Sequence, residues 1–173
     1  MTLFRGNMYT LDKDNVREIT ESCVSGSEFQ LHALYAFRFM TENVYSPIGV
    51  DMSFSTDGKD GISSGLYQKI TGDRSYYLGF IDLHGGLVTI AKGFAGEEFE
   101  NDTEFIRDAT GEFINRINGE FVIESSKSGI MLDMEPQLFL EEDEAASVIK
   151  PEKILHIPIA IGGSEVEMLF VKV

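Results

Sequence analysis

The sequence has little cysteine and few basic residues. Cys23 is the only cysteine among 173 residues, which excludes an intrachain disulfide bond and a thiol-pair redox motif. Lys and Arg number 14 against 29 Asp and Glu, so the formal net charge is −15. This balance argues against binding to nucleic acid or to an anionic membrane, because both need a basic protein surface. An acidic surface that keeps the protein in solution is sufficient to explain it.

Long apolar runs and linker-like segments are also missing. No apolar run approaches the ~20 residues that span a bilayer, and the first residues lack the basic and apolar segments of a signal peptide. We therefore expect a cytoplasmic protein. Hydrophobic residues make up 43% of the chain, and no Pro- or Ser-rich stretch divides it. Residues 1–173 are thus expected to fold around one core as a single domain.

Helical spacing of apolar residues predicts four helices. Capping pairs that begin at Asn15 and Ser27 open a short helix and a longer one, the longer reaching about Tyr45. A third helix is expected after Asp82, which we interpret as its N-cap. The fourth covers the run from Asn101 to Val122.

Alternation of apolar and polar residues predicts about six strands. They cover residues 50–55, 62–70, 75–81, 130–134 with 138–140 as an extension, 153–161 and 165–173. The acidic run Glu141–Glu144 is typical of a solvated loop. The sum predicts an α+β fold, with a largely antiparallel sheet and helices packed on one face. A helix followed by a hairpin occurs in both halves, which gives a weak internal pseudo-repeat.

The run from Asn101 to Val122 is the most informative part of the chain. On a helical wheel its apolar residues form one stripe, and Asp108, Glu112, Asn115 and Gly119 form another on the opposite side. Glu112 and Asn115 are three residues apart, so both point toward the same patch of solvent. A carboxylate beside a carboxamide on an exposed, rigid helix suits contact with a partner's site.

This order of residues, followed by Pro136, resembles the signature helix of the CheX, CheC and FliY family of chemotaxis phosphatases. The resemblance extends over the family core at residues 27–173 and leaves residues 1–26 as an N-terminal extension. The leading helix contains no second Glu-x-x-Asn pair, because Glu42 and Asn43 are adjacent. The chain is therefore closest to the single-site, CheX-like members.

The resemblance implies hydrolysis of the aspartyl phosphate on the receiver domain of a CheY-like response regulator. It places Asn115 where the attacking water is positioned and Glu112 where the receiver's lysine docks. A carboxamide suits the first role because it both accepts and donates hydrogen bonds and does not ionise. Mg²⁺ is expected on the receiver, and no metal or other cofactor on this chain. The resemblance also permits a homodimer.

Five further positions belong to this hypothesis. Asp108 and Gly119 are expected to assist docking of the receiver, Gly119 by allowing close approach. Pro136 either shapes the strand beside the helix or simply bounds it. Arg116 and Asn118 depart from the small residues usual after the Asn in this family. Arg116 flanks the motif and is expected to contact the partner, so it clashes with some receivers or selects others.

Two other functions compete with the phosphatase hypothesis. The first is a non-catalytic CheX-like binding or dimerisation module in two-component signalling, with Glu112 and Asn115 as ordinary surface residues. The second is a serine hydrolase, because residues 61–65 match G-x-S-x-G around Ser63. That chemistry needs a strand, a sharp turn and a helix, whereas a strand-like run follows here. The histidines show no metal-ligand spacing, and His32 is expected to be packed in the core.

Overall fold

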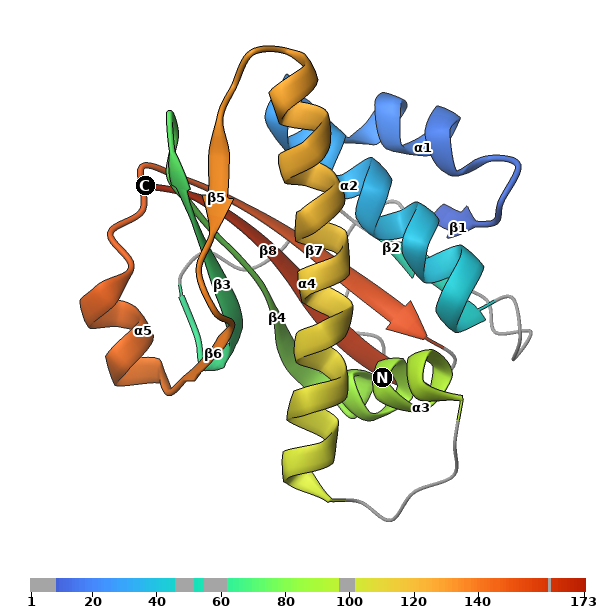
Figure 1. Ribbon diagram of the computed structural model, residues 1–173. Helices are drawn as coiled ribbons and strands as arrows, with labels where there is room; N and C mark the ends of the chain where they lie inside the picture. Colours follow the sequence, from blue (N-terminus) through green and yellow to red (C-terminus); the bar gives the residue numbers. More distant parts are fainter. Residues whose placement is uncertain (1–8, 46–51, 55–61, 97–101, 162) are drawn as a thin grey trace.

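The computed structural model describes residues 9–45, 52–54, 62–96, 102–161 and 163–173 (Figure 1). The helices are α1 (Val16–Cys23), α2 (Ser27–Met40) with the π-helical turn η1 (Thr41–Tyr45), α3 (Gly86–Ala95), α4 (Thr103–Lys127) and α5 (Glu142–Val148). The strands are β1 (Tyr9–Leu11), β2 (Met52–Phe54), β3 (Gly65–Gly72), β4 (Tyr76–His84), β5 (Leu132–Met134), β6 (Leu138–Leu140), β7 (Lys153–Ile161) and β8 (Ser164–Lys172).

In the described part of the chain these strands form one eight-stranded sheet, in the order β1-β2-β7-β8-β4-β3-β5, with β6 also paired to β3. All of the strand pairs are antiparallel. The predicted α+β fold with a largely antiparallel sheet is confirmed. The two strands beyond the expected six are β1 and β6. The sequence predicts β6 only as an extension of β5. The hairpins β3–β4 and β7–β8 meet where β4 pairs β8.

The main core lies between the sheet and the layer of α2, α3 and α4 (Figure 1). Phe170 on β8 is its centre, because four other rings surround it. Its ring centroid lies 4.6 Å from that of Phe29, 5.0 Å from Tyr76, 5.1 Å from His32 and 5.7 Å from Phe121. These partners come from α2, β4 and α4, so one side chain ties both long helices to the middle of the sheet.

The second face of the sheet carries a smaller core under α5. Ala145 and Ile149 are buried there against Tyr67, Leu169 and Val171 of the sheet. Residues 141–144 are exposed as predicted, but the prediction that they form a loop was wrong. Glu141 caps α5, and its side chain and that of Glu144 form a reciprocal capping box, so the acidic residues start a helix.

The predicted caps of α2 and α3 were wrong, and that of α1 was right in position only. Asp82 is not an N-cap, because β4 continues to pair with β8 as far as His84 and α3 starts after Gly85. The N-cap of α2 is Gly26, and Ser27 is already helical. Asn15 is the N-cap residue of α1, as predicted, but its side chain makes no capping hydrogen bond, because its carboxamide donates to the Thr10 carbonyl. Loop contacts of this kind use the same side-chain groups as a cap does.

The segment before α2 is part of the folded unit. Strand β1 pairs with β2 at one end of the sheet, and α1 packs beside α2. Leu11, Val16 and Val24 are buried in the main core. These contacts bring residues 9–24 into the domain, whereas the division of the chain at residue 26 stays a prediction. Residues 50, 51 and 55 of the predicted strand at 50–55 lie outside the described residues. No helix in the described part combines the length and apolarity that crossing a membrane requires.

Candidate functional site

The site is built on α4, which is the longest helix described. Asp102 caps its start by accepting from the Glu104 backbone N–H at 2.9 Å. Phe113, Ile114 and Ile117 are each at most 1% exposed, so the predicted apolar stripe is confirmed as the buried face. The helix ends at Lys127, later than the expected end at Val122.

The opposite side of α4 presents an ion pair to solvent. The Glu112 carboxylate accepts from Arg116 Nε at 3.0 Å, one helical turn away. Their side chains are 49% and 61% exposed, so water screens the pair and it contributes little to stability. Asp108 is exposed on the same side. Both carboxylates are therefore accessible to a partner, as the sequence predicted.

Asn115 lies at the boundary between this exposed side and the sheet. Its side chain is partly buried, and its Oδ1 accepts from Gln68 Nε2 of β3 at 2.9 Å. Asn115 was predicted to point toward the same patch of solvent as Glu112, but it is only partly exposed, because β3 passes beneath this turn of α4 and supplies a donor. The pair Glu112 and Asn115 thus combines an exposed carboxylate with a carboxamide held by a hydrogen bond to the sheet.

The tether continues into the core as a chain of side-chain hydrogen bonds. Gln68 Oε1 accepts from Asn118 Nδ2 at 2.9 Å, and Asn118 Oδ1 lies 2.9 Å from His32 Nε2. Asn118 is 1% exposed, so it cannot contact a partner protein. This corrects its expected placement beside Arg116 on the docking face. Gln68 was missed by the sequence analysis. The available signal was a polar residue at a strand position whose neighbours two residues away, Leu66 and Ile70, belong to the core.

The segment between β5 and β6 closes one side of the site. The Glu135 carbonyl accepts from Gln68 Nε2 at 2.9 Å, and the Glu135 N–H donates to the Lys69 carbonyl at 2.9 Å. Pro136 follows, exposed, where pairing to β3 passes from β5 to β6. A Cβ on Gly111 would lie 2.9 Å from Gln137 Nε2, so this glycine lets the segment lie close against α4.

Gly119 has no such packing role among the residues that the structure describes. A Cβ added there would meet only Met134 Cε, at 3.8 Å, which is an ordinary van der Waals contact. Gly119 has helical φ, so its conformation does not require glycine either. Neither packing nor backbone strain explains this residue, which leaves its docking role as a proposal.

His32 ends the chain of hydrogen bonds and is confirmed as a packed core histidine. The residue is 2% exposed, and burial lowers the pKa of its imidazole to about 4 despite the bond to Asn118. The neutral ring donates through Nε2, because Asn118 presents an oxygen to it. Its other nitrogen, Nδ1, has no hydrogen-bond partner in the described residues.

We expect His32 to make the stability of the protein depend on pH. In the unfolded chain the imidazole has an ordinary pKa of 6.5, so below that pH the unfolded state binds a proton that the folded state excludes. Stability is then lost as the pH falls from about 6.5 toward about 4, by up to about 3 kcal/mol. Urea unfolding of wild type and His32→Gln at pH 7 and pH 4.5 measures this loss.

The comparison variant, His32→Gln, keeps a hydrogen-bond donor near the position of His32 Nε2, but its side chain does not titrate. Subtracting its pH dependence removes the contribution of carboxylates such as Glu28, which are common to both proteins. Between pH 7 and pH 4.5 the free energy of unfolding should therefore fall further for wild type than for His32→Gln. Parallel curves for the two proteins would show that His32 takes up a proton in the folded state.

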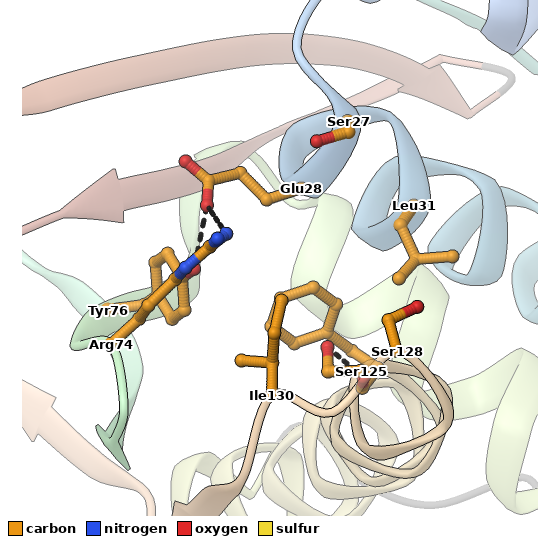
Figure 2. Close-up of a pocket in the computed structure, with 9 residues that line it drawn as sticks. Ser27, Glu28, Leu31, Arg74, Tyr76, Ser125, Ser128 and Ile130 are labelled. Carbon is orange, nitrogen blue, oxygen red and sulfur yellow. Dashed lines mark hydrogen bonds and ion pairs between the residues drawn. The ribbon is translucent and has the colours of Figure 1, made fainter.

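A separate pocket of about 180 Å³ lies near the C-terminal end of α4 (Figure 2). Ser125 on its wall is ten residues from Asn115, which is about 15 Å along a helix. At one side Glu28 Oε2 accepts from Arg74 Nη1 and Tyr76 Oη, each at 2.8 Å. Burial raises the pKa of Glu28, but these bonds and that with Lys172 lower it overall. This cluster binds the start of α2 to the sheet and is not part of the Asn115 site.

The serine hydrolase hypothesis does not fit the structure. Ser63 precedes β3 and is partly buried, and its carbonyl accepts from Tyr67 Oη at 2.7 Å. A strand follows it, not the helix that a nucleophile turn requires. Gly61 of the motif lies outside the described residues. As for metals, no group of three or more His, Cys, Asp or Glu is placed to bind an ion in the part of the chain that is described.

A scan of family models finds no match to the sequence, and a search of curated proteins finds none either. Solved structures do resemble the fold. The crystal structure of the CheX-CheY-BeF3-Mg²⁺ complex from Borrelia burgdorferi matches with a TM-score of 0.67 at 16% identity, over 84% of this chain and 97% of that one. CheX from Desulfovibrio desulfuricans matches with a TM-score of 0.64 at 14% identity, over 86% and 100% of the two chains.

A third match comes from another group of proteins. The middle domain of FliM from H. pylori has a TM-score of 0.52 at 11% identity, over 94% of this chain and 93% of that one. At such identities structural likeness establishes the fold alone. The chain therefore has the fold that CheX, CheC-like and FliM middle-domain proteins share.

Proposed function

We propose that this chain is a CheX-like phosphatase that accelerates hydrolysis of the aspartyl phosphate on a CheY-like receiver domain. The observation that carries the proposal is the placement of Glu112 and Asn115. They stand on neighbouring turns of a long helix, Glu112 on its exposed side and Asn115 at the edge of that side, in a fold similar to that of a CheX in complex with CheY, BeF3 and Mg²⁺. No single one of these facts would suffice, because Glu-x-x-Asn occurs by chance in many helices.

The proposed reaction needs few catalytic groups from this protein. An aspartyl phosphate is an acyl phosphate that already hydrolyses slowly, and in the proposed complex the receiver supplies Mg²⁺ and a lysine. What remains is to hold one water in line with the phosphorus, and positioning of this kind accelerates reactions strongly. Asn115 suits the task, because its carboxamide stays neutral and would not repel the phosphoryl oxygens as a carboxylate would.

Glu112 would bind the receiver's lysine, and this lysine would replace Arg116 as the ion-pair partner of Glu112. An exposed ion pair between residues one turn apart contributes only about 0.3–0.5 kcal/mol of stability, so breaking the bond between Glu112 and Arg116 costs little free energy. A lysine brought by the receiver would meet Glu112 in a desolvated interface, where charge-assisted hydrogen bonds are stronger. Arg116 then lies at the rim, where its length selects among receivers. Dimerisation through the sheet, which the family resemblance permits, stays a prediction.

The remaining motif residues have supporting roles in this proposal. Asp108 would add a second exposed carboxylate one turn before Glu112. Gly119 would leave space for the receiver's backbone, which agrees with the open surroundings of its missing side chain. Pro136 follows the Glu135 carbonyl that accepts from Gln68, so it would fix the strand segment beside Asn115.

The test is the lifetime of phosphorylated receivers. A panel of receiver domains from the same genome is phosphorylated with phosphoramidate in Mg²⁺, the excess donor is removed, and decay is followed with and without this protein. We expect faster decay for at least one receiver and a return to its intrinsic rate with Asn115→Ala. The variant should still bind the BeF3-loaded receiver, because Glu112 is intact.

Two other results would contradict the proposal. Acceleration that persists in Asn115→Ala would place the activity elsewhere in the molecule. No acceleration with any receiver would leave the non-catalytic binding module as the better hypothesis, and binding to BeF3-loaded receivers would then test that module directly.

A further inference from the structure

Donor and acceptor follow in a fixed order along the hydrogen bonds that reach Asn115, and the Glu135 carbonyl oxygen fixes that order. The Glu135 backbone carbonyl only accepts, so the Gln68 atom that lies 2.9 Å from it is the nitrogen Nε2. The same nitrogen lies 2.9 Å from the Asn115 carboxamide, which must therefore face it with its oxygen. Asn115 is left with its Nδ2 hydrogens directed away from Gln68.

The rest of the chain of hydrogen bonds enforces the same direction. With Nε2 facing Glu135, Gln68 offers its oxygen to Asn118, which donates at 2.9 Å and in turn offers its own oxygen to His32. Turning any one carboxamide over would place two donors or two acceptors face to face. Gln68 and Asn118 are each 1% exposed, so water offers no alternative partner to a turned group.

We propose that Gln68 is a positioning residue that holds the Asn115 carboxamide with Oδ1 toward the core and Nδ2 toward the receiver. The inference rests on the proposed phosphatase function and adds a residue of β3 to a site otherwise built on α4. The terminal torsion of an asparagine has no sharp preference by itself. Gln68 removes that freedom on folding, before any receiver docks, and preorganisation of this kind favours the reaction.

The orientation decides what Asn115 offers to the reaction. Its Oδ1 is engaged by Gln68, and no partner for its Nδ2 is found within the described residues. Asn115 therefore meets the receiver as a donor. Donation to one lone pair of the water oxygen leaves the other lone pair free to face the phosphorus. Without Gln68 the carboxamide would present oxygen and nitrogen to the water in turn.

The test replaces Gln68 by Met, which has a similar length and no hydrogen-bonding amide. We expect turnover of the phosphorylated receiver to fall roughly tenfold or more, with the Kd for the BeF3-loaded receiver unchanged. The matched control is Thr110→Val on α4. It also removes a buried hydrogen bond, from Thr110 Oγ1 to the Ile106 carbonyl, but one outside the chain that reaches Asn115. Turnover in this control should equal that of wild type.

A second measurement needs no activity. In ¹⁵N-labelled wild-type protein the side-chain amide protons of Gln68, buried and bonded on both sides, should exchange with water more slowly than those of Asn115 Nδ2. Equal exchange rates, or a Gln68→Met turnover equal to that of Thr110→Val, would overturn the positioning role and leave the phosphatase standing. If wild type accelerates no receiver, the proposed function fails and the catalytic role of Gln68 fails with it, while amide exchange still decides the hydrogen bonding.

Discussion

Asn115→Asp should lose the acceleration of receiver dephosphorylation by about 10²-fold or more, because it changes only the atom that faces the partner. An Asp at this position still presents an oxygen to Gln68 Nε2, so the inward bond is kept. The outward Nδ2 becomes a carboxylate oxygen. In the proposed complex it would lie beside phosphoryl oxygens that already carry negative charge, and at such short range like charges repel strongly.

The measurement is the single-turnover decay rate of the phosphorylated receiver at saturating protein. The protein should remain folded, with a free energy of unfolding within about 1 kcal/mol of wild type, because the site is partly solvated. Asn115→Ala is the companion variant, since it removes both polar atoms and adds no charge. If Asp retains the wild-type rate, the outward donor has no part in the reaction.

Phe170→Ala should destabilise the protein by about 3–5 kcal/mol, the usual range for removal of a fully buried phenylalanine. Phe170 is 1% exposed and lies among four rings from α2, β4 and α4. These elements cannot close the space without moving both long helices relative to the sheet. The loss is a large share of the 5–15 kcal/mol that stabilises most domains.

Urea unfolding followed by circular dichroism measures this loss. Phe170→Leu is the graded control and should cost less than half as much as Ala, because it refills most of the volume. Val148→Ala on α5 is the surface control, since Val148 is 51% exposed and should change stability by no more than about 0.5 kcal/mol. If Phe170→Ala lowers the free energy of unfolding by no more than Val148→Ala does, the ring cluster is not the centre of the core.

The sequence by itself determined the elements that local periodicity encodes. Helix α4, helix α2 and the last hairpin follow from spacings within some 20 residues, which a wheel or an alternation pattern detects. The exposure of Asp108 and Glu112 followed from the same spacings. Caps were less predictable, because the Asn15 side chain bonds to Thr10 instead of to the helix it precedes, and Asp82 lies within β4.

Only the tertiary structure decided what holds Asn115. Its partner Gln68 is 47 residues away in sequence, and Asn118 meets His32 across 86 residues. A helical wheel places Asn115 on the polar side and cannot show that β3 passes beneath it. The physical reason is that a buried polar side chain must find its partners wherever the packed elements bring them, and those partners leave no trace in local spacing.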